Sequence, residues 1–325
     1  MSELRLNPLT GRWVTVALDR AQRPHDFARR TLAVEAGPRR PCPFCPGHEE
    51  ATPPALEVYG PAGRWQVRVV PNLYPAFSGA EPMTVTNLGP IFTQGSASGI
   101  HEVLVLSPAH DQSWADLDDP QSGLVMAAIR DRLEDHARQP NVRYTQVIVN
   151  SGREAGASLD HPHGQLLGIP FVPGELSDEL AGFERFAGSC LLCTTWEAET
   201  RAGHRVVVAD DRVSVLCPFW SASPYEMLVL PKTHGAHLAR AAPRDLAAVG
   251  RAVRTALDRL RRRVDDLAYN VVFHTAPHHM HDDRFHWHVH VVPRVSSVAG
   301  FEQGTGVMIN IVAPELAAKH LTSTT

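Results

Sequence analysis

The chain has 325 residues, of which 43% are hydrophobic and 20% are charged, and its net charge is -4. This length suits two domains of roughly 150 residues each. The sequence contains no run of 18 apolar residues, so it predicts no transmembrane helix. The slightly acidic balance argues against a nucleic-acid-binding protein, which normally carries a basic surface. The first residues, MSELRLNPLTGRW, contain neither a basic nor an apolar leader, so we expect a cytoplasmic protein.

The predicted elements begin with a proline-rich loop. Residues 36–54 contain too many prolines for a regular helix, so the first CxxC pair is expected on a loop or knuckle. Alternating apolar runs then predict three strands, at 65–70, 101–106 and 144–149. Between the last two strands, an Asp-Asp-Pro start predicts a helix from 118 to about 139.

A second loop with two prolines and a glycine, at 169–176, is the predicted join between domains 1–172 and 173–325. A short helix near 177–188 and a second CxxC pair follow it. Strands, a long helix at about 243–263 and further strands then repeat the order of the first half. We therefore predict an α+β fold of two tandem domains, each with an antiparallel sheet and one long helix.

The two halves carry the same markers at an almost constant spacing. Three polar residues recur after 124 or 125 positions: Glu102, His110 and His161 recur as Glu226, His234 and His286. An apolar helical series recurs after 124 positions: Val125, Ile129 and Leu133 recur as Val249, Val253 and Leu257. Such self-similarity at a fixed period indicates an internal duplication.

Each half also contains the ligands of a metal site. The two predicted sets are Cys42, Cys45, His110 and His161, and Cys190, Cys193, His234 and His286. A CxxC turn brings two thiolates to one point, and two histidines complete a tetrahedral zinc site. A lone CxxC pair could equally be two buried thiols, but the duplicated histidines favour metal. Four protein ligands leave no open position for water, so both sites are expected to be structural, with zinc in each or iron in the second.

Residues 150–165, NSGREAGASLDHPHGQ, carry the predicted chemistry. Backbone donors around Gly152 and Gly156, together with the hydroxyl of Ser158, are the kind of lining that binds phosphate oxygens. Next along the chain, His163 has a neutral imidazole at working pH and can attack phosphorus to form a covalent phosphoramidate.

Gln165, two residues further along the predicted strand, points to the same side as His163 and can donate a hydrogen bond to a phosphoryl oxygen. An isolated HPH sequence is more often a metal-ligand pair or a pair of surface histidines. The predicted zinc site uses only His161, however, and leaves His163 without a structural role.

This region resembles the active site of the galactose-1-phosphate uridylyltransferases, a family of the histidine-triad superfamily. The likeness rests on HPHGQ after an Asn-x-Gly-x-x-x-Gly-x-Ser loop that begins at Asn150, and on CPFC, NLYPAF, SPAH, LPKTH, HWHVHVVP and GFEQGTG elsewhere in the chain. It implies two tandem histidine-triad-like domains and a homodimer. It also implies a two-step reaction in which His163 takes the nucleotidyl group from a nucleotide sugar and a sugar 1-phosphate then removes it.

The resemblance assigns further roles residue by residue. Gln165 and Ser158 would contact the transferred phosphoryl group, and Asn72 would lie at the nucleotide. The remaining assignments are Arg20 and Arg23 at the substrate phosphates, and Phe301 and Glu302 at the sugar. Neither nucleic acid nor a membrane is an expected partner.

Several positions depart from the uridylyltransferase pattern. Leu73-Tyr74 follows Asn72 where Asp-Phe is common, and Ser296 and Met308 replace a lysine and a glutamine near the sugar-binding glutamate. The NLYPA and GFExGTG patterns, together with the complete second zinc set, look more like the ADP-glucose phosphorylase branch of the family.

Two alternatives therefore stand beside nucleotidyl transfer between sugar phosphates. One is phosphorolysis of an ADP-sugar or a dinucleoside polyphosphate. The other is a non-catalytic zinc-knuckle interaction module, which predicts no covalent intermediate. In the second half, His288 is expected to be a wall of the sugar site or an auxiliary metal ligand, and 274–281 to be a loop over the active site.

Overall fold

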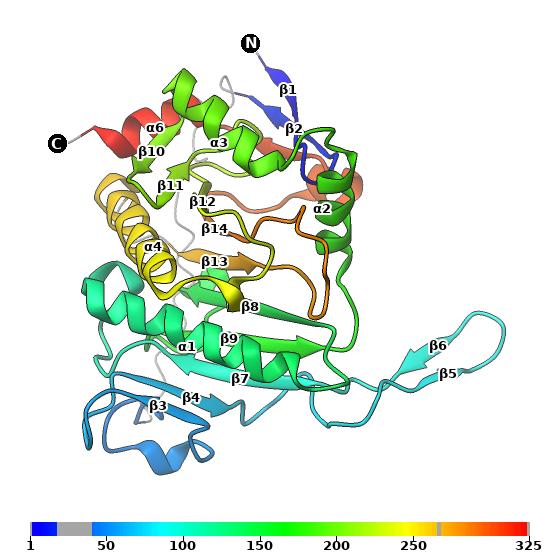
Figure 1. The fold of residues 1–325 in the computed structure, drawn as a ribbon, viewed down its shortest axis with the longest axis vertical. Coiled ribbons are helices and arrows are strands. Elements are labelled where there is room, and N and C mark those ends of the chain that lie inside the picture. Colours follow the sequence, from blue (N-terminus) through cyan, green and yellow to red (C-terminus); the bar gives the residue numbers. More distant parts are fainter. Residues whose placement is uncertain (1, 18–40, 265–267, 324–325) are drawn as a thin grey trace.

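The computed structural model describes residues 2–17, 41–264 and 268–323. Within these ranges the chain forms a ten-stranded antiparallel sheet, a three-stranded sheet and a two-stranded hairpin, together with six α-helices (Figure 1). The predicted α+β class is confirmed. The two halves share one continuous sheet, which the sequence patterns did not indicate.

The ten-stranded sheet consists of two five-stranded blocks that meet where β8 pairs with β13. From the outer edge inward, the first block is β3 (Glu57–Tyr59), β4 (Val67–Pro71), β7 (Ile100–Val105), β9 (His163–Ile169) and β8 (Tyr144–Ser151). In the same order, the second is β10 (Val206–Ala209), β11 (Val213–Leu216), β12 (Met227–Pro231), β14 (His288–Pro293) and β13 (Tyr269–His274). Each strand thus has a counterpart across the β8–β13 junction, as a duplication requires.

Two long helices, α1 (Asp119–Ala137) and α4 (Pro243–Val264), lie side by side over one face of this sheet (Figure 1). Both were predicted from apolar periodicity. Their apolar stripes pack against alternate strand residues such as Leu104, Val147 and Val229, which form one continuous buried cluster. The main core of the protein therefore lies between the sheet and the α1–α4 layer.

The opposite face of the sheet differs between the two blocks. Over the second block, α2 (Gly174–Arg185) and α3 (Leu191–Ala202) pack on Leu228 and Leu230 and form a second apolar cluster. Helix α2 begins three residues before its predicted start, and α3 was not predicted. Over the first block, the packing is limited to a small cluster around Phe44. This difference leaves room for a cavity on the first block.

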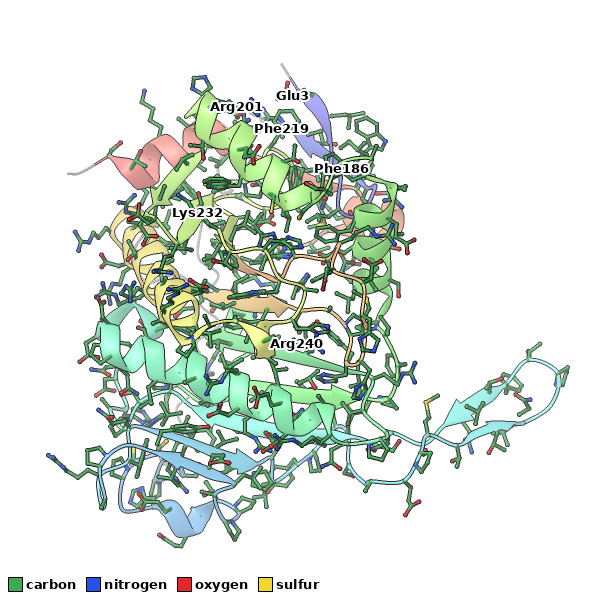
Figure 2. The ribbon with its side chains drawn as sticks, viewed as in Figure 1. Glu3, Phe186, Arg201, Phe219, Lys232 and Arg240 are labelled. Atoms are coloured by element: carbon green, nitrogen blue, oxygen red, sulfur yellow. The ribbon has the colours of Figure 1, made fainter. Side chains whose placement is uncertain are left out.

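The other elements lie at the edges of this body. They are β1 (Glu3–Leu6), β2 (Trp13–Val16), β15 (Met308–Asn310), α5 (Gly300–Thr305), α6 (Pro314–Thr322), and the hairpin β5 (Val85–Asn87) and β6 (Thr93–Gly95). Short 3-10 turns lie at Glu49–Ala51, Trp114–Asp116, Arg153–Ala155 and Leu238–Arg240. Side chains fill the space between the helices and the sheet, whereas those of the hairpin stand away from the body (Figure 2).

The predicted join at 169–176 coincides with the interval between the end of β9 and the start of α2. Because the sheet runs unbroken through both halves, the division into domains 1–172 and 173–325 stays a prediction. None of the helices in the described ranges is both long and apolar enough to span a membrane.

Helices α1 and α4 approach closely at Gly250. A Cβ at Gly250 would lie 2.6 Å from the carbonyl oxygen of Ser122, whereas a Cβ at Gly123 would lie 3.5 Å from the Cβ of Ala247, an ordinary contact. We expect Gly250→Ala to lower the free energy of unfolding by about 1–2 kcal/mol, because overpacking outweighs the better helix propensity of alanine. The matched Gly123→Ala should leave it unchanged or raise it by up to about 1 kcal/mol. Urea unfolding measures both, and equal effects would contradict this account of the helix contact.

Candidate active site and metal centres

His163 is the first residue of β9 and is 5% exposed. Its Nδ1 lies 2.8 Å from the carbonyl oxygen of His161. Because a carbonyl oxygen only accepts hydrogen bonds, Nδ1 carries the ring proton and Nε2 keeps its lone pair. Burial lowers the pKa of this imidazole, and the bond to the His161 carbonyl, which raises it, does not cancel the effect. The ring is therefore neutral, with one nucleophilic nitrogen.

His163 and Gln165 line a cavity of about 840 Å³ on the face of the sheet that α1 does not cover. Phe44, from the loop that carries the first CxxC pair, forms one wall, and its ring centroid lies 5.5 Å from that of His163. The segment after β4, Asn72 to Tyr74, and Ser158 also line it. A volume of this size suits a small-molecule ligand as large as a nucleotide.

The loop between β8 and β9 depends on two glycines in left-handed backbone conformations. Gly152 has φ +82° and Gly156 has φ +86°, and a Cβ at Gly152 would lie 2.7 Å from the Cβ of Ala268. Asn150 fixes the start of the loop, since its Oδ1 accepts a hydrogen bond of 2.7 Å from Nδ2 of Asn270. Arg153, which the sequence patterns did not single out, also lines the cavity.

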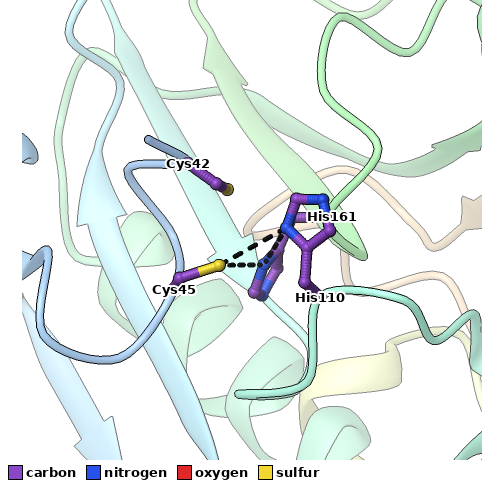
Figure 3. A group of neighbouring side chains, drawn as sticks. All are labelled: Cys42, Cys45, His110 and His161. Carbon is purple, nitrogen blue, oxygen red and sulfur yellow. Dashed lines mark hydrogen bonds between the residues drawn. The ribbon is translucent and has the colours of Figure 1, made fainter. Parts of the chain in front are cut away.

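The first predicted metal set comes together beside this cavity (Figure 3). Sγ of Cys45 lies 3.4 Å from Nδ1 of His110 and 3.7 Å from Nδ1 of His161. Tetrahedral zinc with these donors requires ligand separations of about 3.3–3.8 Å. A second contact fixes the orientation of the His161 ring, because its Nε2, the nitrogen away from the cysteines, donates to the carbonyl oxygen of Ser107 at 2.8 Å. The donor set therefore fits zinc.

The second predicted set has the same geometry. Sγ of Cys193 lies 3.4 Å from Nδ1 of His286 and 3.7 Å from Nδ1 of His234. Nε2 of His286 donates to the carbonyl oxygen of Pro231 at 3.0 Å, as His161 does to Ser107 in the first set. Cys190 is the residue that precedes α3, so this CxxC pair sits at a helix start.

A third group of metal-ligand type was not predicted as a set: Glu179, His274, His288 and His290. Nδ1 of His274 lies 2.9 Å from Oε1 of Glu179, and Nε2 of His288 lies 3.7 Å from Oε2. Burial alone would raise the pKa of Glu179, but His274 and His288 hold it well below its usual range. Nε2 of His288 and Nε2 of His290 are buried and lack hydrogen-bond partners in the described part of the chain. These donors suit a divalent cation.

The same 124- or 125-residue spacing would have found the three histidines of this group, but not Glu179. His274, His288 and His290 correspond to Asn150, His163 and Gln165 of the first half. His288 also repeats the tautomer of His163, since its Nδ1 donates to the carbonyl oxygen of His286 at 2.8 Å. The place of the cavity in the first half is thus taken in the second half by histidines gathered around Glu179. Of the two expectations for His288, the auxiliary ligand fits this arrangement.

The sequence matches the galactose-1-phosphate uridyl transferase N-terminal domain over residues 1–173 and a domain of unknown function over residues 119–324. The chain belongs to the galactose-1-phosphate uridylyltransferase family. ADP-glucose phosphorylase of Arabidopsis thaliana is 32% identical to it, over 98% of this chain and 91% of the relative. Galactose-1-phosphate uridylyltransferase of Thermotoga maritima is 28% identical, over 100% and 99%.

Solved structures of the uridylyltransferase family agree with this fold. The crystal structure of Arabidopsis thaliana ADP-glucose phosphorylase with bound ADP-glucose has a TM-score of 0.86 and 30% identity, covering 100% of both chains. A uridylyltransferase structure has a TM-score of 0.77 and 26% identity, covering 99% of this chain and 97% of the other. The predicted family, its duplicated fold and its nucleotidyltransferase class are confirmed.

The predicted substrate residues of this family member fall into three places. Asn72, Ser158, His163 and Gln165 line the cavity, and Asn150, Gly152 and Gly156 shape the loop beside it. Phe301 and Glu302 lie on α5, which does not line the cavity, and Oε2 of Glu302 accepts from the backbone N–H of Ala299. Arg20 and Arg23 lie outside the described residues. The functional roles of all these residues stay predictions.

Removing one ligand should remove one metal ion. We expect Cys190→Ser to lower the metal content by one equivalent per chain and to lower the Tm, because metal binding at a structural site contributes to folding. Cys217→Ala is the matched control, since Cys217 is buried but belongs to none of the three groups. Elemental analysis of the purified proteins gives the answer. Unchanged metal content in Cys190→Ser would contradict the assignment.

Proposed function

We propose that the chain transfers a nucleoside monophosphate from a nucleotide sugar to a sugar 1-phosphate, through a covalent intermediate on His163. One observation carries this proposal: a buried, neutral imidazole, whose proton is held on Nδ1 and whose Nε2 is unprotonated, lines a cavity large enough for a nucleotide. Membership of the uridylyltransferase family supports the same chemistry.

In the first step, the Nε2 lone pair of His163 attacks the α-phosphorus of the nucleotide sugar. The bond from that phosphorus to the bridging oxygen breaks, and the sugar 1-phosphate leaves with the electron pair. In the second step, a phosphate oxygen of the incoming sugar 1-phosphate attacks the same phosphorus, and the electron pair of the N–P bond returns to Nε2. Splitting the displacement in this way lets one histidine serve both half-reactions.

The surrounding residues would bind and orient the phosphates. Gln165 and Ser158 donate to the non-bridging oxygens of the transferred group, and the loop of Gly152 and Gly156 supplies backbone donors. Asn72, at the start of the wall formed by Leu73 and Tyr74, lies at the nucleotide.

The other predicted substrate contacts are Arg20 and Arg23 at the phosphates. We also propose a homodimer, in which α5 brings Phe301 and Glu302 to the sugar in the partner's cavity, because α5 does not line the cavity of its own chain.

Zinc in the two Cys-Cys-His-His sets would be structural. In the first set it would fix the loop that carries Phe44 and would hold His161, whose carbonyl sets the tautomer of His163. Iron is the alternative in the second half, where the group around Glu179 also offers ligands. No bond is made or broken at a metal in either half-reaction.

Phosphorolysis of an ADP-sugar is the second candidate. The ADP-glucose phosphorylase relative is more similar in sequence and structure than the uridylyltransferases compared above. Leu73 and Tyr74 stand where Asp and Phe are common in uridylyltransferases, so this wall favours a different base. In this reaction inorganic phosphate replaces the sugar 1-phosphate as the acceptor, and a nucleoside diphosphate is released.

The covalent intermediate should be visible by mass. We expect the intact protein to gain one nucleotidyl group after brief incubation with UDP-glucose or with ADP-glucose, and His163→Gly to gain none because it lacks the nucleophile. His204→Ala, which changes an exposed histidine outside the cavity, is the matched control and should gain the group as the wild type does. An adduct of unchanged yield on His163→Gly would contradict the assignment, and a wild type without any adduct would favour the zinc-knuckle module.

The preferred acceptor of the nucleotidyl group distinguishes a transferase from a phosphorylase. Adduct-bearing enzyme should release its nucleotidyl group to galactose 1-phosphate as a nucleotide sugar, or to inorganic phosphate as a nucleoside diphosphate. We expect one acceptor to be preferred by at least about 100-fold in kcat/KM, since an acceptor sugar that fills its subsite contributes binding energy that phosphate lacks. Chromatography of the released nucleotide measures the preference. Release to plain water alone would contradict both reactions.

A further inference from the structure

His101 lies beside Gln165 on the cavity face of the sheet. It is the second residue of β7, directly opposite Leu167 of β9, which places it diagonally across from Gln165. Its Nε2 lies 2.8 Å from Oε1 of Gln165. Its Nδ1 lies 3.0 Å from the backbone nitrogen of Ala76, in the segment that follows the cavity wall at Asn72 to Tyr74.

These two contacts fix the tautomer of His101. The backbone N–H of Ala76 can only donate, so Nδ1 of His101 must accept and carries no proton. A neutral imidazole then has its proton on Nε2, which donates to Oε1 of Gln165. The amide oxygen of Gln165 is thereby occupied, and its NH₂ group is the part left to face the cavity.

We propose that His101 is a positioning residue that sets the orientation of the Gln165 amide, so that Gln165 presents N–H donors to the phosphoryl group being transferred. This inference rests on the proposed function, in which Gln165 contacts that group. A glutamine amide can turn over about its last side-chain bond, and the turned form would present an oxygen to a negatively charged phosphoryl oxygen. The hydrogen bond from His101 disfavours that form before substrate binds.

Asn72 cannot accept the Nε2 proton of His101. Its Oδ1 accepts from the backbone N–H of Tyr74 at 2.9 Å, so its amide nitrogen is the atom that lies 3.1 Å from Nε2 of His101. Two donors do not form a hydrogen bond with each other, which leaves Oε1 of Gln165 as the acceptor for the His101 proton. His101 thus joins two functions: it anchors the wall segment through Nδ1 and orients Gln165 through Nε2.

The two functions can be separated by substitution. His101→Gln can place an amide N–H near the position of Nε2 and keep the donor to Gln165, whereas His101→Asn can place an oxygen near the position of Nδ1 and keep only the acceptor for Ala76. We expect His101→Asn to slow formation of the nucleotidyl enzyme in a single turnover by about 10- to 100-fold. His101→Gln should retain a rate within about threefold of the wild type, because its amide N–H can still donate a hydrogen bond to Oε1 of Gln165. Equal losses in both variants would overturn the proposal.

A double-mutant cycle tests whether His101 acts through Gln165. If it does, His101→Asn should have little further effect in a Gln165→Ala background, because no amide is left to orient. If the two losses multiply, His101 acts by another route and the proposal is wrong. The Tm of each variant, measured in parallel, identifies any loss that comes from unfolding.

The tautomer itself can be measured without turnover. In a long-range proton–nitrogen spectrum of the ¹⁵N-histidine-labelled protein, the signals lost in His101→Asn belong to His101. They should report a proton on Nε2 and a bare Nδ1, and a ring protonated on Nδ1 would overturn the proposal even if the nucleotidyl transfer is found as expected. If the wild type forms no adduct, the proposed function fails, while this spectrum still decides the hydrogen-bond arrangement.

Discussion

The pairing of β8 with β13 joins the two halves into one sheet, and the cavity depends on it. At this junction Asn150 and Asn270 face each other, and the Nδ2 group of Asn270 donates to Asn150 at the start of the loop that leads to His163. The same Asn270 donates to the carbonyl oxygen of Ala155 inside that loop and accepts from Arg294 through its Oδ1. The second half therefore supports the β8–β9 loop of the first half through strand pairing and a buried polar network.

The two halves share a backbone geometry but place the corresponding histidines, His163 and His288, in different surroundings. In both halves a histidine donates from Nδ1 to the carbonyl two residues earlier, so His163 and His288 hold the same tautomer. Over the first half the sheet face is only partly covered, and His163 lines a cavity. Over the second half, α2 covers the face and brings Glu179 against His288, and burial lowers the pKa of His288 to about 4. Packing, more than local sequence, therefore distinguishes the surroundings of His163 from those of His288.

Much of the fold was predictable because it is encoded locally. Apolar periodicity predicted both long helices, and an Asp-Asp-Pro sequence predicted the start of the first. The CxxC pairs and the duplicated histidines predicted the metal-ligand sets. Helix α3 was missed because it begins directly after Cys190, inside a motif that was interpreted only as a source of thiol ligands. Its first residues, Leu191 and Leu192, are buried against strands that are distant in sequence. Glu179 was missed for a similar reason, since a single glutamate in a helix has no pattern that points to His274.

By itself, the sequence determined the duplicated architecture, the metal-ligand sets and the family to which the chain belongs, because each rests on residue types at fixed spacings. It also marked His163 and Gln165 as neighbours on one face of a strand. Only the tertiary structure decided which half keeps an open cavity, which carbonyl fixes the proton of His163, and that His101 lies within hydrogen-bond distance of Gln165. Those features depend on contacts between strands and loops far apart in the chain, whose distances no local pattern specifies.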